Sequence, residues 1–324
     1  MRVISFLKQW ILPLAMTSGA AAYLIYDNIP SLKPAGPYLA EAVGILQPLL
    51  IFAMLFLSFC KISPKDMKPR KWHLKLLIFQ GGIFTLLAIV TACFPEFDGR
   101  ILIESAMLCI ICPTATAAAV ITGRLGGDMP GLTTYTVLIN ITTGLLVPLM
   151  IPLVHPEDGV PFSTAFSMIM AKVFPLLICP CLAAWLVRYL MPKVHNWLTK
   201  FSNLAFYLWG IALTIAIATT TKSIIHSTTS IYYETGIALV SLLCCAIQFF
   251  IGKKIGKRYN ASITAGQSLG QKNTVFAIWM GYTFMTPATS IAGGFYCIWH
   301  NAYNSWQLYR KEKSTPGSSG EPLP

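Results

Sequence analysis

Long apolar stretches, repeated along most of the chain, are the feature that most restricts its fold. Only 11% of the 324 residues are charged and 55% are hydrophobic, whereas about a quarter of the residues in an ordinary soluble domain are charged. A helix that crosses a bilayer needs about 20 mainly apolar residues. We therefore expect an all-α membrane protein with ten transmembrane helices, over residues 9–26, 39–60, 73–94, 100–123, 131–154, 164–190, 202–222, 234–252, 262–283 and 287–309.

The basic residues test this count, because Lys and Arg concentrate in the cytoplasmic loops of membrane proteins. With ten spans and the N-terminus inside, 19 of the 24 Lys and Arg residues fall on the inner side. If a span had been missed or added, the basic residues after that point would be assigned to the wrong side of the membrane. We therefore expect a multi-pass protein with both termini in the cytoplasm, and we interpret the net charge of +12 as an orientation signal rather than as a nucleic-acid-binding surface.

Ten spans divide into two halves of five, residues 1–155 and 160–312, followed by a cytoplasmic tail at 313–324 that we expect to be disordered. Because five is odd, the second half enters the membrane from the opposite side, which is the condition for an inverted-topology repeat. The fourth span of each half is interrupted. Span four contains CPTATAAA from Cys112, and span nine contains GQSLGQKNT from Gly266, about 155 residues later.

Interrupted spans at matching positions are a pointer to a transport site. Non-helical backbone inside a bilayer is tolerated only where protein or a water-filled cavity satisfies its N–H and C=O groups, and helix N-termini favour anions. We therefore predict two discontinuous helices that form an anion-binding site near the membrane centre. The substrate-binding candidates are Thr114, Thr116, Gln271, Lys272, Asn273 and Thr274. For Thr114 and Ser268, a hydrogen bond to a carbonyl of the same helix is the structural alternative.

These motifs resemble the bile acid:sodium symporter family, in its bacterial branch, over about residues 5–312. The pattern C-P-x-x-T-A at Cys112 to Ala117 and the pattern Q-x-N at Gln271 to Asn273 carry the resemblance. It implies a panel domain and a core domain, with the two discontinuous helices crossing in the core, and alternating access by movement of one domain against the other. It implies a bile acid-like or small carboxylate substrate. Together with the absence of a targeting peptide, it predicts the inner (plasma) membrane.

The chain departs from the family pattern where the family holds sodium. The family sequence C-P-G-G-T-A-S-N has Ala118 and Ala119 at its Ser and Asn positions here, and E-x-G-x-Q-N has Gln267 at its Glu position and Lys272 at its Asn position. The Glu, Ser and Asn are sodium ligands in the family, so the resemblance implies a depleted sodium site. The ion-coupling positions to compare with the structure are Ala118, Ala119, Thr136, Gln267, Ser268, Gln271 and Lys272.

Lys272 is the most unusual of these residues, because an unpaired ammonium within a span costs at least a few kcal/mol. It could replace a sodium ion and hold the broken helices together, pair with the substrate carboxylate, or titrate and couple transport to protons. The structural alternative is that its side chain extends to a membrane interface.

Four other polar residues complete the set. We expect Glu104 and Lys172 near outer helix ends, close to water, and His300 in a structural hydrogen bond. Gln80 lies in span three, where the family contributes a Gln to its second sodium site.

We therefore predict a secondary active transporter of a small organic anion, with altered or absent sodium dependence. The alternatives are a proton-coupled or uncoupled carrier and a transporter-like sensor. We expect no enzyme activity and no catalytic residue, because the chain has no H-E-x-x-H or G-x-S-x-G and no His spaced to serve a Ser or Cys. Cys109 and Cys112 form a lone C-x-x-C, which predicts packing rather than a metal site. The expected partners are the anion and the lipid bilayer, with no cofactor other than Na+ or H+ as coupling ion and with the oligomeric state open.

Overall fold

The computed structural model describes residues 2–201 and 204–314, and regular structure in this part of the chain is helical. Two short 3-10 segments, η1 (Pro30–Ala35) and η2 (Pro64–Asp66), precede the second and third helices. The α-helices are α1 (Arg2–Asn28), α2 (Gly36–Cys60), α3 (Lys71–Cys93), α4 (Arg100–Ile111), α5 (Ala118–Arg124), α6 (Met129–Val154), α7 (Phe162–Leu190), α8 (Pro192–Lys200), α9 (Leu204–Ile225), α10 (Ile231–Lys257), α11 (Ser262–Gly270), α12 (Thr274–Phe284) and α13 (Pro287–Ser314).

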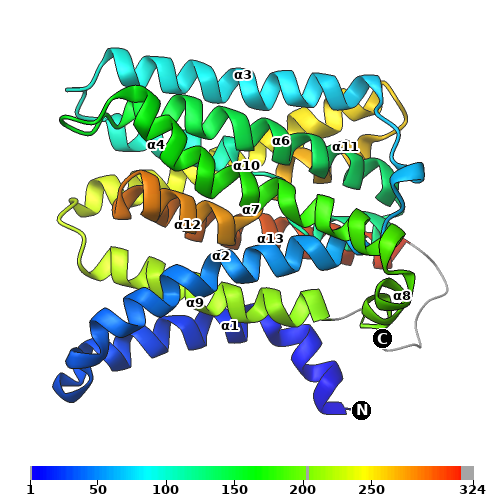
Figure 1. The fold of residues 1–324 in the computed structure, drawn as a ribbon, viewed down its shortest axis with the longest axis horizontal. Helices are drawn as coiled ribbons and strands as arrows, with labels where there is room; N and C mark the ends of the chain where they lie inside the picture. Colours follow the sequence, from blue (N-terminus) through cyan, green and yellow to red (C-terminus); the bar gives the residue numbers. More distant parts are fainter. Residues whose placement is uncertain (1, 202–203, 315–324) are drawn as a thin grey trace.

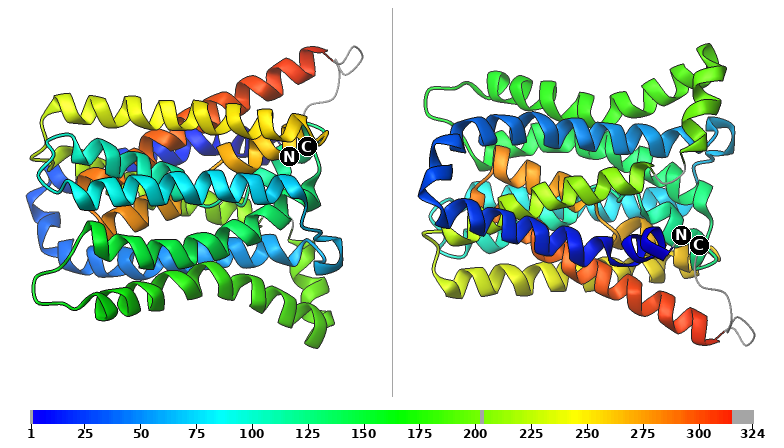
Figure 2. Two further views of the ribbon diagram at one scale, coloured as in Figure 1. Left: turned by 90° about the horizontal axis from the view of Figure 1, so that it is seen from above. Right: turned by 90° about the horizontal axis from the view of Figure 1, so that it is seen from below.

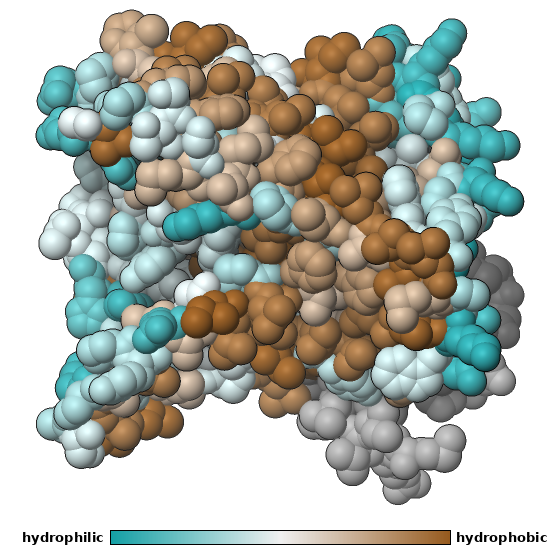
Figure 3. Space-filling model, viewed as in Figure 1, coloured by the Kyte–Doolittle hydropathy of each residue, from teal (hydrophilic) through white to brown (hydrophobic). Residues whose placement is uncertain are grey.

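Six helical segments of the described chain are long and apolar enough to cross a membrane: α2 with the η1 segment before it, α3, α6, α7, α9 and α10. Figure 3 shows hydrophobic residues over the middle of one face and hydrophilic residues at its two ends. The chain is therefore an all-α, multi-pass membrane protein. Each predicted span overlaps one helix, or two helices at 100–123 and 262–283, while the number of membrane crossings stays a prediction.

The helices form two groups that lie side by side (Figure 1). In the first, α1 packs on α9, α9 on α2, and α2 on α7; we call this the four-helix layer. In the second, α3, α6, α10 and α13 surround the short helices α4, α5, α11 and α12; we call this the broken-helix group. The two groups meet where α7 packs on α6, where α9 contacts α12 and α13, and where α2 contacts α12.

The first interruption has a local cause, whereas the second lies at a close contact between two helices. Pro113 follows α4, and a proline disfavours helical backbone at the residue before it, so α4 ends at Ile111. The helix α11 ends at Gly270, where a Cβ atom would lie 2.4 Å from the Phe249 ring of α10. Only glycine allows this close approach. Each expected discontinuous helix is therefore a pair of short helices, α4 with α5 and α11 with α12.

Two segments differ from the sequence-based expectation. The helix α8 was not predicted; it begins with Pro192, which suits the first helical position, and it is held by a hydrogen bond between His195 Nε2 and the Cys60 carbonyl oxygen at 2.8 Å. The disordered tail was expected from residue 313, but α13 continues to Ser314. Lys311 and Lys313 lie in its last turn, where cations stabilise a helix. The rest of that tail lies outside the described residues.

Candidate functional site

The two interruptions lie directly against each other in the broken-helix group. The Ala115 N–H donates to the Gln271 carbonyl at 2.9 Å, and the Asn273 N–H donates to the Pro113 carbonyl at 2.8 Å. Thr114 and Lys272 thereby form an isolated antiparallel bridge. Each unwound segment satisfies backbone groups of the other, which is how non-helical backbone is stabilised away from water. We call residues 112–117 and 271–273 the crossing.

Side chains from four other places satisfy the free carbonyl groups at the C-terminus of α4. The Lys272 ammonium donates to the Ile110 carbonyl oxygen at 3.1 Å, and Gln248 Nε2 donates to the Cys109 carbonyl oxygen at 3.2 Å. Gln80 Nε2 donates to the carbonyl oxygens of Ile111 and Cys112, at 3.2 and 3.0 Å. Thr143 Oγ1 also donates to the Ile111 carbonyl oxygen, at 3.0 Å. The carbonyl end of a helix carries partial negative charge, so the ammonium lies where a cation is favoured.

Lys272 is buried, with 1% of its surface exposed, so its side chain does not extend to a membrane interface. Its ammonium reaches the end of α4, 162 positions away in sequence. None of the ion pairs between described residues includes it. The ammonium therefore makes a direct contact between the second interruption and the C-terminal end of α4.

Other predicted site residues join the same crossing. Thr114 Oγ1 donates to the Ser268 carbonyl at 2.7 Å, so it links the two interruptions and does not bond back to its own helix. His300 Nδ1 accepts the Lys272 backbone N–H at 3.3 Å, in a structural hydrogen bond of the kind expected. Gln267 Nε2 donates to Asn304 Oδ1 at 2.9 Å.

Several buried polar atoms at the crossing have no hydrogen-bond partner among the described residues. They are Gln267 Oε1, Ser268 Oγ, Gln271 Oε1 and Asn273 Nδ2. Buried polar groups are normally paired, so these unpaired atoms are an exception within the described part of the chain. Thr274 is buried beside them, and Thr116 is only half-buried, at the edge of the crossing.

The remaining coupling positions offer little to an ion. Ala118 and Ala119 present methyl groups beside the crossing. Thr136 Oγ1 donates to the Leu132 carbonyl of its own helix at 3.1 Å. Gln80 bonds carbonyl groups at the end of α4, and its Oε1 accepts a hydrogen bond from the Tyr135 hydroxyl at 2.8 Å.

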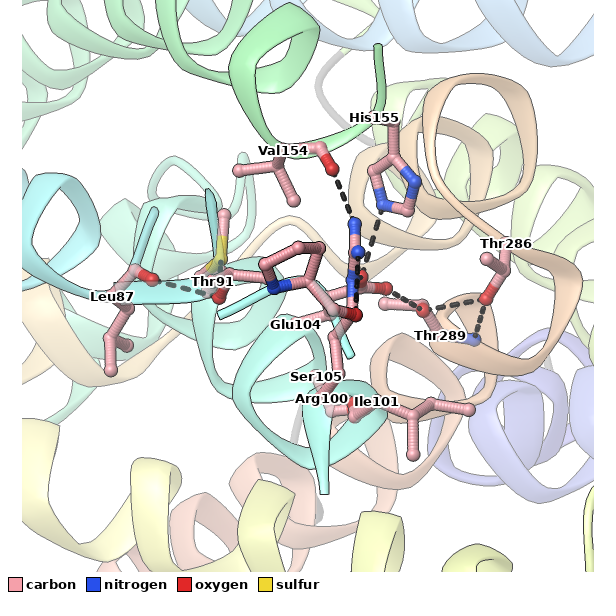
Figure 4. A network of polar contacts seen from close by, with 12 residues as sticks. Leu87, Thr91, Arg100, Ile101, Glu104, Ser105, Val154, His155, Thr286 and Thr289 are labelled. Atoms are coloured by element: carbon pink, nitrogen blue, oxygen red, sulfur yellow. Dashed lines mark hydrogen bonds and ion pairs between the residues drawn. The ribbon is translucent and has the colours of Figure 1, made fainter. Parts of the chain in front are cut away.

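Sequence reasoning missed a polar network around Glu104 (Figure 4). The expectation that Glu104 lies close to water is wrong, because only 3% of its side chain is exposed. Glu104 Oε1 lies 2.7 Å from Arg100 Nε and 3.3 Å from His155 Nε2, and Oε2 accepts a hydrogen bond from Thr289 Oγ1 at 3.0 Å. The spacing of Arg100 and Glu104, one helical turn apart, was the available signal.

Arg100 also bonds the Val154 carbonyl at the end of α6. The network therefore connects α4 with α6 and α13. All three helices belong to the broken-helix group, so these contacts do not connect it to the four-helix layer. Lys172, by contrast, is exposed as expected, with its ammonium 5.8 Å from the centre of the Phe284 ring.

Comparison with known proteins identifies the family. The sequence profile described as Sodium Bile acid symporter family matches residues 48–227, more than half of the chain. The comparison with curated proteins gave no match. The matched region includes α4, the first half of the crossing and the α6 residues beneath it. The chain therefore belongs to the sodium bile acid symporter family.

Proposed function

We propose that this protein is a secondary active transporter that moves a small organic anion across the inner membrane by alternating access, without dependence on sodium. The observation that carries the proposal is the crossing itself, where two interrupted helices are paired and several buried polar atoms have no partner among the residues that the structure describes. Membership of a symporter family supports transport. The substrate class and the coupling are our inference from the residues.

The start of α12 is the part of the crossing best suited to an anion. Asn273 caps this helix by accepting the Phe276 N–H with its Oδ1 at 3.3 Å, and its Nδ2 is buried without a partner in the described chain. A helix N-terminus carries partial positive charge, so a carboxylate placed here meets the Asn273 amide as well. The Thr116 hydroxyl, half-buried at the edge, is a second donor.

The proposed topology has ten crossings, in halves at 1–155 and 160–312 related as an inverted repeat. The interrupted pair α4 and α5 and the pair α11 and α12 support it, because each comes fourth in its half. Figure 2 shows α1 beginning and α13 ending at the same end of the bundle, as both termini in the cytoplasm require. In this proposal the four-helix layer is the panel domain, and the broken-helix group is the core that moves against it.

The residues present fit a sodium site of the family's kind poorly. Sodium prefers oxygen ligands and a nearby negative charge, yet the Glu position holds Gln267, and the Ser and Asn positions hold Ala118 and Ala119. Gln267, Ser268 and Gln271 retain free side-chain oxygens but supply no charge. The Lys272 ammonium adds positive charge in the same region. We infer that the Lys272 ammonium replaces the sodium ion that other members of the family bind.

Replacing sodium with choline is expected to leave the melting temperature of the purified protein unchanged. A ligand that binds only the folded state must raise its stability, and the depleted site has little affinity to contribute. The variant Lys272→Asn restores the family residue and removes the competing charge, so it is the comparison in which any sodium effect should emerge. A clear increase for the unaltered protein in sodium would refute the proposal of sodium independence.

Proteoliposomes test transport directly, with radiolabelled pantoate and taurocholate as probes. We expect the unaltered protein to accumulate one of them above equilibrium when a membrane potential or proton gradient is applied. The variant Thr116→Val should lower the initial rate about tenfold or more, the effect of losing a hydrogen bond to a charged group. Its control is Thr214→Val, because Thr214 is half-buried and bonds its own helix at the Gly210 carbonyl.

The same assay separates the alternatives. Accumulation driven only by a proton gradient identifies a proton-coupled carrier, and accumulation that follows the membrane potential alone identifies an uncoupled one. Binding of a probe with no movement across the membrane would contradict the transporter proposal and favour a sensor.

A further inference from the structure

A cavity lies away from the crossing, where the four-helix layer meets the broken-helix group. It has a volume of about 380 Å³. We propose that it is an outer binding site that receives the transported anion first and selects small organic carboxylates over larger steroid conjugates. Its role as a receiving site rests on the proposed transport function.

Both groups of helices build this cavity. From the four-helix layer come Lys222 and Ser223 of α9 and the residues 226–229 that join α9 to α10. From the broken-helix group come Tyr282 of α12, Thr286 and the start of α13. Movement of one group against the other must therefore open or close the cavity, so its occupancy and alternating access are linked.

The lining favours a negative guest. Lys222 and His226 are its ionisable nitrogen groups, most of the other lining residues carry hydroxyls, and none of the lining residues is acidic. The Lys222 ammonium lies 3.3 Å from the Tyr282 hydroxyl and 5.8 Å from the centre of its ring. The ammonium and the hydroxyl, one from each group of helices, can both donate to the same carboxylate.

Two carboxylates lie nearby but do not line the cavity. The Glu104 carboxylate is paired with Arg100, and it contacts Thr289, whose hydroxyl lies 2.7 Å from that of the lining residue Thr286. Asp27 Oδ1 is 3.4 Å from His226 Nε2, and the Lys33 ammonium also bonds this oxygen. Asp27 therefore already has a cationic partner outside the cavity. Lys222 forms no ion pair among those of the described residues, which leaves its charge available to a ligand.

The size of the cavity determines which anions it selects. Ligand sites commonly span about 300–1,000 Å³, and this cavity is near the lower limit. Its volume suits a short carboxylate with hydroxyl groups better than a steroid skeleton. Figure 3 shows hydrophilic residues reaching inward from the left end of the molecule, the end at which α9 and α10 are joined in Figure 1. In the proposed topology this is the outer end, so an anion arriving from outside meets the cavity before the crossing.

The test uses a cysteine placed in the cavity wall, Thr228→Cys, in the full-length protein in proteoliposomes. Thr228 is exposed and lies between helices, so the change disturbs no helix. The measurement is the labelling rate with anionic 2-sulfonatoethyl methanethiosulfonate divided by that with the cationic 2-trimethylammonioethyl reagent. The protein without the new cysteine supplies the background from the native cysteines, among which Cys93 is exposed.

Adding Lys222→Gln should lower this ratio about threefold to tenfold, as removal of one nearby unit charge predicts. The matched control is Lys254→Gln, because Lys254 is also exposed and lies 5.8 Å from the centre of an aromatic ring, Phe250, but outside the cavity. It should leave the ratio unchanged. Equal ratios for the two lysine variants would overturn the anion site.

Competition tests the substrate class. Pantoate should slow labelling by the anionic reagent at least twofold, and Lys222→Gln should abolish this protection. Failure of pantoate to protect would overturn the carboxylate assignment, and equal protection by taurocholate would overturn the size selection. Labelling requires no transport, so a failed accumulation assay with an intact Lys222 effect refutes transport alone. Normal accumulation without that effect refutes the outer site alone.

Discussion

Substitution of Glu104 by alanine is expected to lower the free energy of unfolding by about 3–5 kcal/mol. Removing one member of a buried ion pair leaves the charge of the other member without compensation. Glu104 is almost fully buried, and Arg100, His155 and Thr289 all contact its carboxylate. The loss should also loosen the contacts between α4, α6 and α13. Denaturation with SDS in mixed micelles measures the change.

Two companion variants make this result interpretable. Glu104→Gln keeps the shape of the side chain and an oxygen that can accept from the Thr289 hydroxyl, but it removes the charge. Its stability should therefore lie between those of the unaltered protein and the Glu104→Ala variant. Glu41→Ala removes an exposed carboxylate and should change the unfolding free energy by less than about 0.5 kcal/mol. If Glu104→Ala were no more destabilising than Glu41→Ala, the network would contribute nothing to stability.

Substitution of Gln80 by leucine is expected to lower the free energy of unfolding by about 2–5 kcal/mol, since each buried polar group left unpaired costs about 1–3 kcal/mol. Gln80 is fully buried and serves both the carbonyls at the end of α4 and the Tyr135 hydroxyl. Leucine has similar bulk, so the loss reports hydrogen bonding rather than packing. The same SDS titration applies.

Gln47→Leu is the matched control for this prediction. Gln47 is also buried in a helix, but its Nε2 has no partner in the part of the chain that the structure describes. Replacing an unpaired amide by an apolar group should be neutral or stabilising. Equal destabilisation by both leucine variants would mean that bulk and shape, and not the support of α4, explain the Gln80 effect.

The helices and the positions of their interruptions were predictable because apolar stretches, proline and glycine are visible in the local sequence. Apolar stretches of sufficient length predicted helices at the observed places, and Pro113 and Gly270 mark the residues at which α4 and α11 end. The motifs at the two interruptions also predicted the family, which the profile match confirms. By contrast, the short and mostly polar helix α8 gave no such signal, since its position depends on the Cys60 carbonyl of another helix.

The site was predictable in its residues but not in its contacts. Lys272 was identified from its place within an apolar stretch, and the structure excludes the interfacial position by burying its side chain, with the ammonium on the Ile110 carbonyl. The three roles considered for it stay predictions. Glu104 was expected near water because it follows the start of a span by one turn. Its burial depends on His155, the residue directly after α6, and on Thr289 of α13.

By itself, the sequence determined that this protein is helical, membrane-embedded and interrupted at two matching places. Those properties follow from hydrogen bonds and apolar surface within one short segment. Only the tertiary structure decided which atoms meet at the crossing, where Thr114 and Lys272 are paired, and how the ends of α4 are satisfied. Such contacts join residues many positions apart, and packing between helices, which no local pattern encodes, fixes them.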